Sequence, residues 1–264
     1  MLRAAPVLML LASPSAVPVV RGLDHAPVAV IDLDRAAADF RRLGFVLKPG
    51  RAHADGIRNM HAKFPNHGGI EFISVSRPHG PLADEYARWL AHGEGGAWWA
   101  AYAPDTAALA ARLSTLGLAL QDGSELPQTA LPHRVFFGTR GSSLTDAPRW
   151  YAHPNTAYRL TAVWLAGSMP ERRLLASFGV PERTEPVCAP FARTARALVF
   201  AEGDRARYVD VAAVPDRAIL ALTVRVRDLA VATRFVAQAR VPSHRCPRSI
   251  WARSHGVWLE FEAT

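Results

Sequence analysis

Residues 22 to 45 have the sequence GLDHAPVAVIDLDRAAADFRRLGF, and this stretch decides the fold. Its first part, from Leu23 to Val30, is mostly apolar and predicts a strand. Gly44 predicts the end of the helix that follows. One face of that helix carries the apolar residues Leu33, Ala36, Ala37, Phe40 and Leu43.

Three more strand-like segments follow this helix. They are Phe45–Leu47, Met60–Phe64 and Ile70–Val75, and a loop rich in Gly and His separates the first two. The predicted order is therefore strand, helix and three strands, which is a βαβββ module.

The pattern repeats along the chain. Helix ends are predicted at Gly44, Gly117, Gly179 and Arg240, so successive ends lie 73, 62 and 61 residues apart (117−44, 179−117, 240−179). The predicted N-caps of the later helices are Asp105, Ser168 (with Glu171 three residues on) and Asp228. We expect an α+β fold of four βαβββ modules that form two curled mixed sheets, with the helices on the convex faces.

The chain of 264 residues divides into three predicted parts. Residues 1–21 form a leader, residues 22–150 hold modules 1 and 2, and residues 151–264 hold modules 3 and 4. The boundary falls at the turn-rich segment Gly141–Pro148.

The leader resembles a secretory signal peptide. Met1–Arg3 is followed by an apolar stretch, Ala4–Ala12, and then by small residues. The apolar stretch is too short to span a membrane, and no other segment is long enough. We expect a periplasmic or secreted protein whose mature chain begins between Val17 and Gly22; the alternative is a cytoplasmic protein with an N-terminal tail.

Charge and cysteine content narrow the choice of partners. The net charge is +8, but the arginines are scattered and no nucleic-acid-binding motif accompanies them, so no nucleic-acid partner is expected. Cys188 and Cys246 lack metal-type spacing. They are two free thiols, or a single disulfide if the chain is exported.

Several segments resemble the glyoxalase-like domain family of the vicinal oxygen chelate (glyoxalase/bleomycin-resistance/extradiol-dioxygenase) superfamily. Besides residues 22–45, they are Arg51–His53 with Gly56 and Asn59, Ile70–Val75, Gly93–Trp98 and His153–Thr156. The resemblance covers nearly the whole chain from Gly22 onward.

This resemblance implies metal ligands on the first and last strands of paired modules. In module 1 these are His25 and Glu71, and aligning the last strands adds Glu260 from module 4. Imidazole with carboxylate suits Fe(II), Mn(II), Ni(II) or Zn(II). The positions that align with His25 hold no histidine; they are Trp98, Thr161 and Ala221. His53 or His61 could complete the set.

Two functions follow from the resemblance. The first is a divalent-metal-dependent lyase, isomerase or dioxygenase that acts on a small oxygen-bearing molecule, with Glu71 and His53 as catalytic groups. Arg58, Asn59 and Trp98 would bind its substrate. The alternative is a metal-free protein that binds or sequesters a small ligand, as bleomycin-resistance proteins do, and the missing histidines favour it. Neither needs a membrane span, and both leave room for a homodimer.

Strand alternation predicts the direction of Glu71. Ile70 and Phe72 share one face of their strand and suit the apolar helix, so Glu71 and Ile73 face the other way. We therefore expect Glu71 and His25 to face one cavity within coordination reach of each other. The simpler interpretation is that His25 is a buried core histidine.

Overall fold

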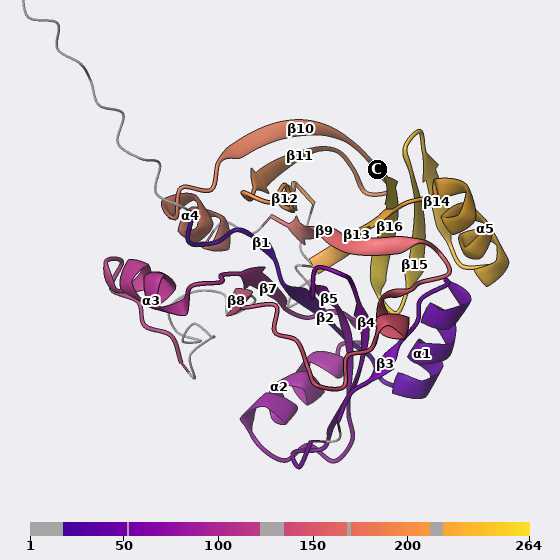
Figure 1. Cartoon of the computed structure of the whole chain (residues 1–264), viewed down its shortest axis with the longest axis horizontal. Helices are drawn as coiled ribbons and strands as arrows, with labels where there is room; N and C mark the ends of the chain where they lie inside the picture. The colour runs from indigo at the N-terminus through magenta and orange to yellow at the C-terminus, as the bar shows by residue number, and fades with distance from the viewer. Residues whose placement is uncertain (1–17, 52, 122–134, 168–169, 212–218) are drawn as a thin grey trace, which may run out of the picture.

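The computed structural model describes residues 18–51, 53–121, 135–167, 170–211 and 219–264 (Figure 1). The predicted leader up to Val17 and the predicted cap Ser168 lie outside these ranges. Among the described residues, no helix is both long enough and apolar enough to cross a bilayer.

Module 1 has the predicted order. After the short strand β1 (Gly22–Leu23) come β2 (His25–Ala29), α1 (Leu33–Arg42), β3 (Lys48–Pro49), β4 (Ile57–Lys63) and β5 (Gly69–Val75). Helix α1 begins at Asp32, whose carboxylate accepts a hydrogen bond from the backbone N–H of Arg35 at 3.0 Å.

Modules 3 and 4 repeat this order, and the described residues of module 2 hold its first strand, its helix and one later strand. Module 2 contains β6 (Gly95–Gly96), β7 (Trp99–Tyr102), α3 (Thr106–Ser114) and β8 (Val135–Gly138); a 3₁₀ turn, η1 (Pro148–Tyr151), follows it. Module 3 contains β9 (Ala157–Ala166), α4 (Pro170–Ser177), β10 (Glu182–Ala189), β11 (Ala192–Val199) and β12 (Arg205–Val209). Module 4 contains β13 (Ile219–Val226), α5 (Leu229–Ala239), β14 (Ser243–Cys246), β15 (Ser249–Ser254) and β16 (Val257–Ala263).

The predicted helix ends are confirmed by the backbone. Gly44, Gly117 and Gly179 have φ of +83°, +71° and +81°, the left-handed conformation that glycine adopts without strain. Arg240, where the fourth glycine is missing, adopts the same region with φ +53° and forms the C-cap of α5. The repeat therefore fixes the same turn even where its usual residue is absent.

Modules 3 and 4 form one curled mixed sheet. Its strand order is β10-β11-β12-β9-β13-β16-β15-β14, and the first strands β9 and β13 pair antiparallel at the centre. A disulfide between Cys188 of β10 and Cys246 of β14 links the two outer strands, with their Cα atoms 5.9 Å apart. This bond closes the curl of the sheet.

Modules 1 and 2 form the second curled arrangement. The strands β3-β4-β5-β2-β6 pair in this order, and β1-β7-β8 form a separate set of three. The start of module 1 pairs antiparallel with the start of module 2 in both sets, through β2 with β6 and β1 with β7. Ile219 of β13 pairs with Gly96 of β6, and this pairing makes the strands of the two halves one continuous sheet. The predicted α+β fold with large curled mixed sheets is confirmed.

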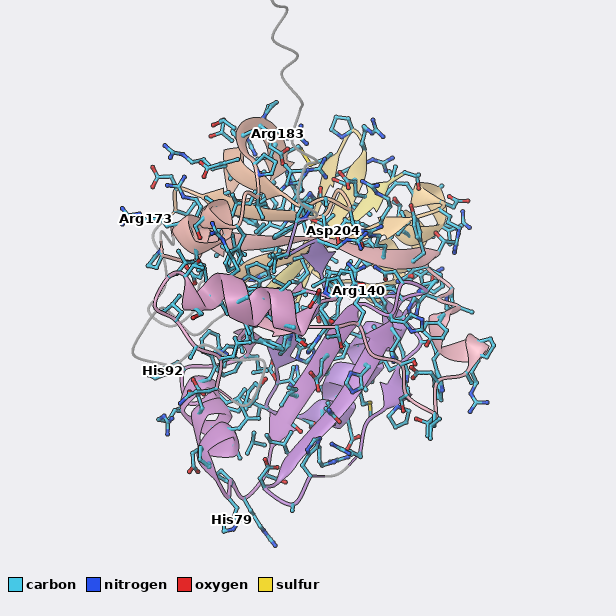
Figure 2. The ribbon with its side chains drawn as sticks, turned by 60° about the vertical axis from the view of Figure 1, so that its left-hand side comes forward. His79, His92, Arg140, Arg173, Arg183 and Asp204 are labelled. Carbon is cyan, nitrogen blue, oxygen red and sulfur yellow. A yellow bond between two sulfur atoms is a disulfide. The ribbon has the colours of Figure 1, made fainter. Side chains whose placement is uncertain are left out.

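A buried ion-pair network lies at the junction of the halves. Figure 2 shows Arg140 and Asp204 there, and Arg140 Nη2 lies 3.1 Å from Asp204 Oδ2. Asp204 also accepts a hydrogen bond from the backbone N–H of Leu23 at 3.0 Å, and the backbone N–H of Arg140 donates to Asp24. The segment that enters β2 is therefore held by residues from both halves.

One helix was not predicted. Helix α2 (Pro81–Leu90) follows module 1 and buries Ala83, Tyr86 and Trp89 against it. Proline in its first turn and the spacing of these apolar residues are recognisable helix signals, but they fall outside the repeating pattern.

Candidate functional site

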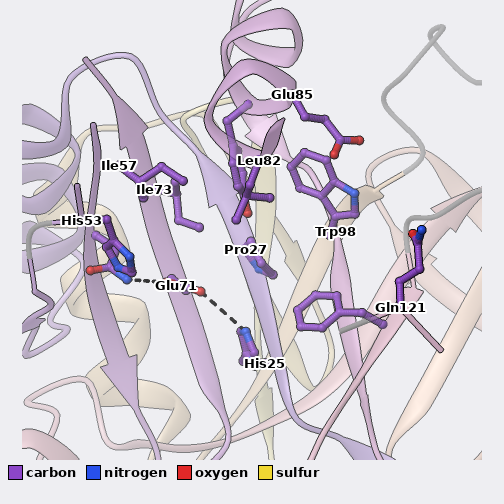
Figure 3. A pocket seen from close by; sticks show the side chains of 13 residues that line it. His25, Pro27, His53, Ile57, Glu71, Ile73, Leu82, Glu85, Trp98 and Gln121 are labelled. Carbon is purple, nitrogen blue, oxygen red and sulfur yellow. Dashed lines mark hydrogen bonds and ion pairs between the residues drawn. The ribbon is translucent and has the colours of Figure 1, made fainter. Parts of the chain in front are cut away.

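A cavity of about 230 Å³ opens on the concave side of modules 1 and 2 (Figure 3). Strands β2, β4 and β5 supply one wall, and α2 with residues of module 2 supplies the other. The lining residues are His25, Pro27, His53, Ile57, Asn59, Glu71, Ile73, Leu82, Glu85, Tyr86, Trp98, Gln121 and Phe136.

His25 and Glu71 face this cavity together, as alternation predicts. His25 Nε2 lies 3.5 Å from Glu71 Oε2, and the other ring nitrogen, Nδ1, donates to Asp24 Oδ1 at 2.6 Å. On the opposite face of β5, the ring of Phe72 lies 4.1 Å from that of Phe40 in α1. Packing of this apolar face against α1 turns Glu71 toward the cavity.

Two more side chains of β4 surround Glu71. Asn59 Nδ2 donates to Glu71 Oε1 at 2.6 Å, and His61 Nε2 lies 3.9 Å from the same oxygen. Burial alone would raise the pKa of Glu71, but the hydrogen bond and charge of His25, with His61 and Asn59, lower that pKa to about 2.

His25 is held as an imidazolium. Burial alone would lower its pKa, but hydrogen bonds and charge from Asp24 and Glu71 outweigh burial and raise the pKa to about 10. Burial is the largest influence on His61, and its pKa is lowered. The floor of the cavity thus holds a cation next to an anion at neutral pH, and their nearest atoms are 3.5 Å apart.

The opposite wall of the cavity is aromatic. The ring of Trp98 lies 4.5 Å from that of Tyr86, and the ring of Phe136 lies edge-on to His25 at 5.2 Å. These rings give the cavity an apolar side facing its charged floor.

The register of the strands shows what these aromatic residues replace. The parallel strands β2 and β5 pair Pro27 with Glu71, and the parallel strands β7 and β8 pair Ala100 with Phe136. Phe136 therefore holds in module 2 the position of Glu71 in module 1.

The same register relates Trp98 to His25. Each precedes by two residues the first-strand member of those pairs, and both line the cavity. The sequence alignment of Trp98 with His25 agrees with this geometry. Module 2 thus places two aromatic residues where module 1 places an imidazole and a carboxylate.

This donor set does not complete a divalent-metal site. Metal sites with catalytic roles use three protein ligands. Here His25 Nε2 lies 3.5 Å from Glu71 Oε2 and His61 Nε2 lies 3.9 Å from Glu71 Oε1, but the ligand atoms of these three residues do not all lie within 4.8 Å of one another. Among the described residues, only one group of three His, Cys, Asp or Glu side chains has its ligand atoms within 4.8 Å of one another. That group, Cys188 with His244 and Cys246, lies in the other half.

Glu260, the third predicted metal ligand, lies in the sheet of modules 3 and 4. It pairs with Thr223 as Glu71 pairs with Pro27, so the alignment of the last strands holds but places Glu260 in the half formed by modules 3 and 4. Its carboxylate accepts hydrogen bonds from Thr223 Oγ1 at 2.7 Å and Ser249 Oγ at 2.8 Å. The prediction that it joins the site of His25 is wrong.

Two predicted substrate-binding residues, Arg58 and Asn59, lie on opposite sides of their strand. Arg58 and Asn59 belong to β4 rather than to a loop, so they point in opposite directions. Asn59 lines the cavity, whereas Arg58 is exposed and lies 3.6 Å from Asp34. The assignment of Arg58 to the cavity is wrong; His53 and Trp98, like His25, line it.

Several residues at this site were not predicted from the sequence, among them Asp24, Glu85 and Tyr86. Asp24 orients His25, and Glu85 and Tyr86 of α2 line the cavity. Asp24 directly precedes His25, and a buried acid beside a strand histidine is a signal that could have been used. Tyr86 could be found only by recognising α2.

Comparison with known proteins agrees with this geometry. A family model described as "Glyoxalase-like domain" matches residues 23–176, which is more than half of the chain. No curated protein matches the chain.

Several solved structures share the fold. A triple mutant of 4-hydroxymandelate synthase from Streptomyces coelicolor is 14% identical, with a TM-score of 0.63 and 92% of each chain covered. The 2,3-dioxygenase LapB from Pseudomonas sp. KL28 is 14% identical, with a TM-score of 0.62 and 94% of each chain covered.

A fusion protein of a xylose isomerase-like TIM barrel and a 4-hydroxyphenylpyruvate dioxygenase is 13% identical, with a TM-score of 0.63. The match covers 95% of this chain but only 50% of the fusion protein. Likenesses at this identity concern the fold alone. The family-model match, which covers more than half of the chain, shows that the chain belongs to the glyoxalase-like domain family.

Proposed function

We propose that this protein binds a small, mostly apolar molecule in the cavity of modules 1 and 2, without a metal ion. The observation that carries the proposal is the replacement of one imidazole–carboxylate pair by Trp98 and Phe136. An apolar ligand body packs against these rings, which bury large areas and accept flat partners.

The charged floor selects the polar group of the ligand. His25 donates through Nε2 and Glu71 accepts, and the 3.5 Å between their nearest atoms separates a donor from an acceptor. A hydroxyl group satisfies both, because it accepts from an imidazolium and donates to a carboxylate. The ligand is therefore an apolar molecule that carries a hydroxyl.

A second candidate is a metal-dependent enzyme of the lyase, isomerase or dioxygenase class. It is favoured by the orientation of both donors: Asp24 holds His25 Nδ1, and Asn59 holds the second oxygen of Glu71. Outer-sphere partners of this kind often accompany metal ligands. The dioxygenases among the similar structures also favour it.

Metal content and ligand binding separate the two candidates. Protein purified without chelator is analysed for transition metals and then titrated with paired ligands, such as a bicyclic phenol and the same molecule without its hydroxyl. We expect substoichiometric metal and at least about tenfold weaker binding of the ligand without hydroxyl. Stoichiometric metal that His25→Ala removes would establish the metal-dependent candidate instead.

Variants in one strand provide the matched control. Glu71→Gln and Asn59→Ala alter the floor, and we expect each to weaken binding of the phenol by about tenfold or more. Arg58→Ala, on the outward face of β4, leaves the affinity unchanged. Circular dichroism verifies that each variant folds. Equal affinities across all four proteins would contradict the proposal.

A further inference from the structure

A second cluster of chemically reactive side chains lies far from this cavity in the sequence. It is at the seam of the modules 3–4 sheet, where the outer strands β10 and β14 meet. Cys188 is in β10, and His244 and Cys246 are in β14. His244 Nε2 lies 3.9 Å from Cys188 Sγ, and the ligand atoms of all three residues lie within 4.8 Å of one another.

Strand geometry explains why the three side chains converge. His244 and Cys246 are two residues apart in β14, so they project from the same face of the strand. Cys188 reaches them from β10, the opposite edge of the curled sheet. Cys246 is buried, while Cys188 and His244 are half-buried and accessible to solvent.

We propose that reduction of the Cys188–Cys246 disulfide converts this cluster into a Zn²⁺ site with two thiolates and one imidazole. These are preferred zinc ligands, and Cys₂His with one open position is an established zinc-ligand combination. In a tetrahedral site with Zn–S of about 2.3 Å and Zn–N of about 2.0 Å, sulfur and nitrogen lie about 3.6 Å apart. The 3.9 Å between His244 and Cys188 is close to this spacing.

The conversion needs a reductant, and a dithiol supplies it. The dithiol transfers two electrons to the disulfide and becomes a cyclic disulfide, while the sulfurs of Cys188 and Cys246 become thiols. On metal binding each thiol releases its proton to solvent, and both sulfurs coordinate Zn²⁺ with His244. Both redox states thus join β10 to β14, by a covalent bond in one and by a metal ion in the other.

Metal titration of the full chain tests the proposal. One sample is kept oxidised, and another is reduced with a dithiol that is then removed without oxygen. Each is titrated with Zn²⁺ against a chromophoric chelator, and with Co²⁺, whose thiolate charge-transfer absorption reports sulfur ligation. We expect one equivalent of Zn²⁺ and the Co²⁺ absorption in the reduced sample alone.

Variants identify the ligands. His244→Ala weakens Zn²⁺ binding by at least about tenfold, and Cys188→Ser abolishes the Co²⁺ absorption. Alkylation of the reduced wild-type chain abolishes it too, which keeps the test valid if a variant fails to fold. His25→Ala binds Zn²⁺ as the wild type does, which separates this site from the cavity of modules 1 and 2. A reduced wild type without Co²⁺ absorption, or a His244→Ala variant with unchanged affinity, would overturn the proposal.

Discussion

The ring of Phe136 lies edge-on to the ring of His25, with 5.2 Å between their centroids. Phe136 holds the strand position where module 1 has Glu71, so an aromatic ring faces the imidazole from the place of a second carboxylate. The two modules that build the cavity thus share a backbone plan and differ in chemistry: one supplies charge and the other an apolar surface.

Restoring the two donors in module 2 should create a metal site. We expect the double variant Trp98→His, Phe136→Glu to bind Zn²⁺ or Ni²⁺ at least about a hundredfold more tightly than the wild type, because four donors then face one cavity. Calorimetric titration of oxidised protein measures the gain. Adding His25→Ala to the double variant should remove most of the gain in metal affinity. If the triple variant keeps the higher affinity, the metal binds elsewhere.

Glu71 should make stability depend on acid. Its folded pKa of about 2 lies below its ordinary value of 4.5, so its contribution is present above pH 4.5 and is lost as the pH falls toward 2. The difference of about 2.5 pKa units corresponds to on the order of 3 kcal/mol. Urea unfolding should show Glu71→Gln less stable than the wild type at neutral pH, with the gap narrowing as the pH falls below 4.5. A constant gap contradicts the linkage.

His255 should make stability depend on pH with the opposite sign to Glu71. Its Nδ1 lies 2.8 Å from Glu94 Oε2 and its Nε2 lies 3.0 Å from Asp39 Oδ2. Burial opposes the charged form, but these two carboxylates raise the pKa of His255 above 6.5. Its stabilisation is therefore complete below pH 6.5 and is lost as the pH rises through the folded pKa.

The variant His255→Ala tests this linkage. Its free energy of unfolding should fall short of the wild type by more at about pH 5.5 than at about pH 9. His79→Ala provides the control, because His79 is exposed at the tip of a loop (Figure 2). If both variants show the same pH dependence of unfolding free energy, His255 does not titrate between Asp39 and Glu94 as described.

The disulfide should contribute measurably to stability. It closes a loop of 58 residues in sequence separation, for which removal typically costs about 2–4 kcal/mol. Cys188→Ser with Cys246→Ser, compared with the oxidised wild type in metal-free urea, should unfold at lower denaturant and with a steeper slope, because the unfolded chain without the cross-link exposes more surface. Coincident curves would show that the seam is held by other contacts.

Export remains our proposal for this chain, and the disulfide supports it because such bonds persist in oxidising compartments. The predicted cleavage lies between Val17 and Gly22, just before β1. N-terminal sequencing of protein from its native host should find a start in that window. An intact Met1 in the purified protein would refute it and favour the cytoplasmic alternative.

The repeat could be predicted because local signals agree with one another at each helix. Asp32, Asp105 and Asp228 all cap their helices through the carboxylate, and the left-handed turns recur at the helix ends. Alternation along β5 correctly turned Glu71 toward His25. The division of the chain near residue 150 and a homodimer stay predictions.

Other features depend on contacts that no local pattern reveals. Glu260 resembles Glu71 in its strand, but strand order places it in the half formed by modules 3 and 4, where Thr223 and Ser249 donate hydrogen bonds to it. Arg58 was assigned to a loop because glycine and histidine precede it. Strand β4 begins earlier than predicted and includes Arg58, whose side chain therefore points away from the cavity. His153 and Asn155 belong to the fold: Asn155 Nδ2 donates to Leu43 O at 2.8 Å, beside the end of α1.

The seam between β10 and β14 also bears on how the protein behaves at high concentration. A sheet normally ends in two strands whose free backbone groups can pair with a strand of another molecule and start aggregation. Here those two strands face each other and are covalently linked. In the described part of modules 1 and 2, one edge is the two-residue strand β3, which contains Pro49 and so lacks a backbone donor there. Curling the modules 3–4 sheet until β10 meets β14 thus shields both edges from pairing with a strand of another molecule.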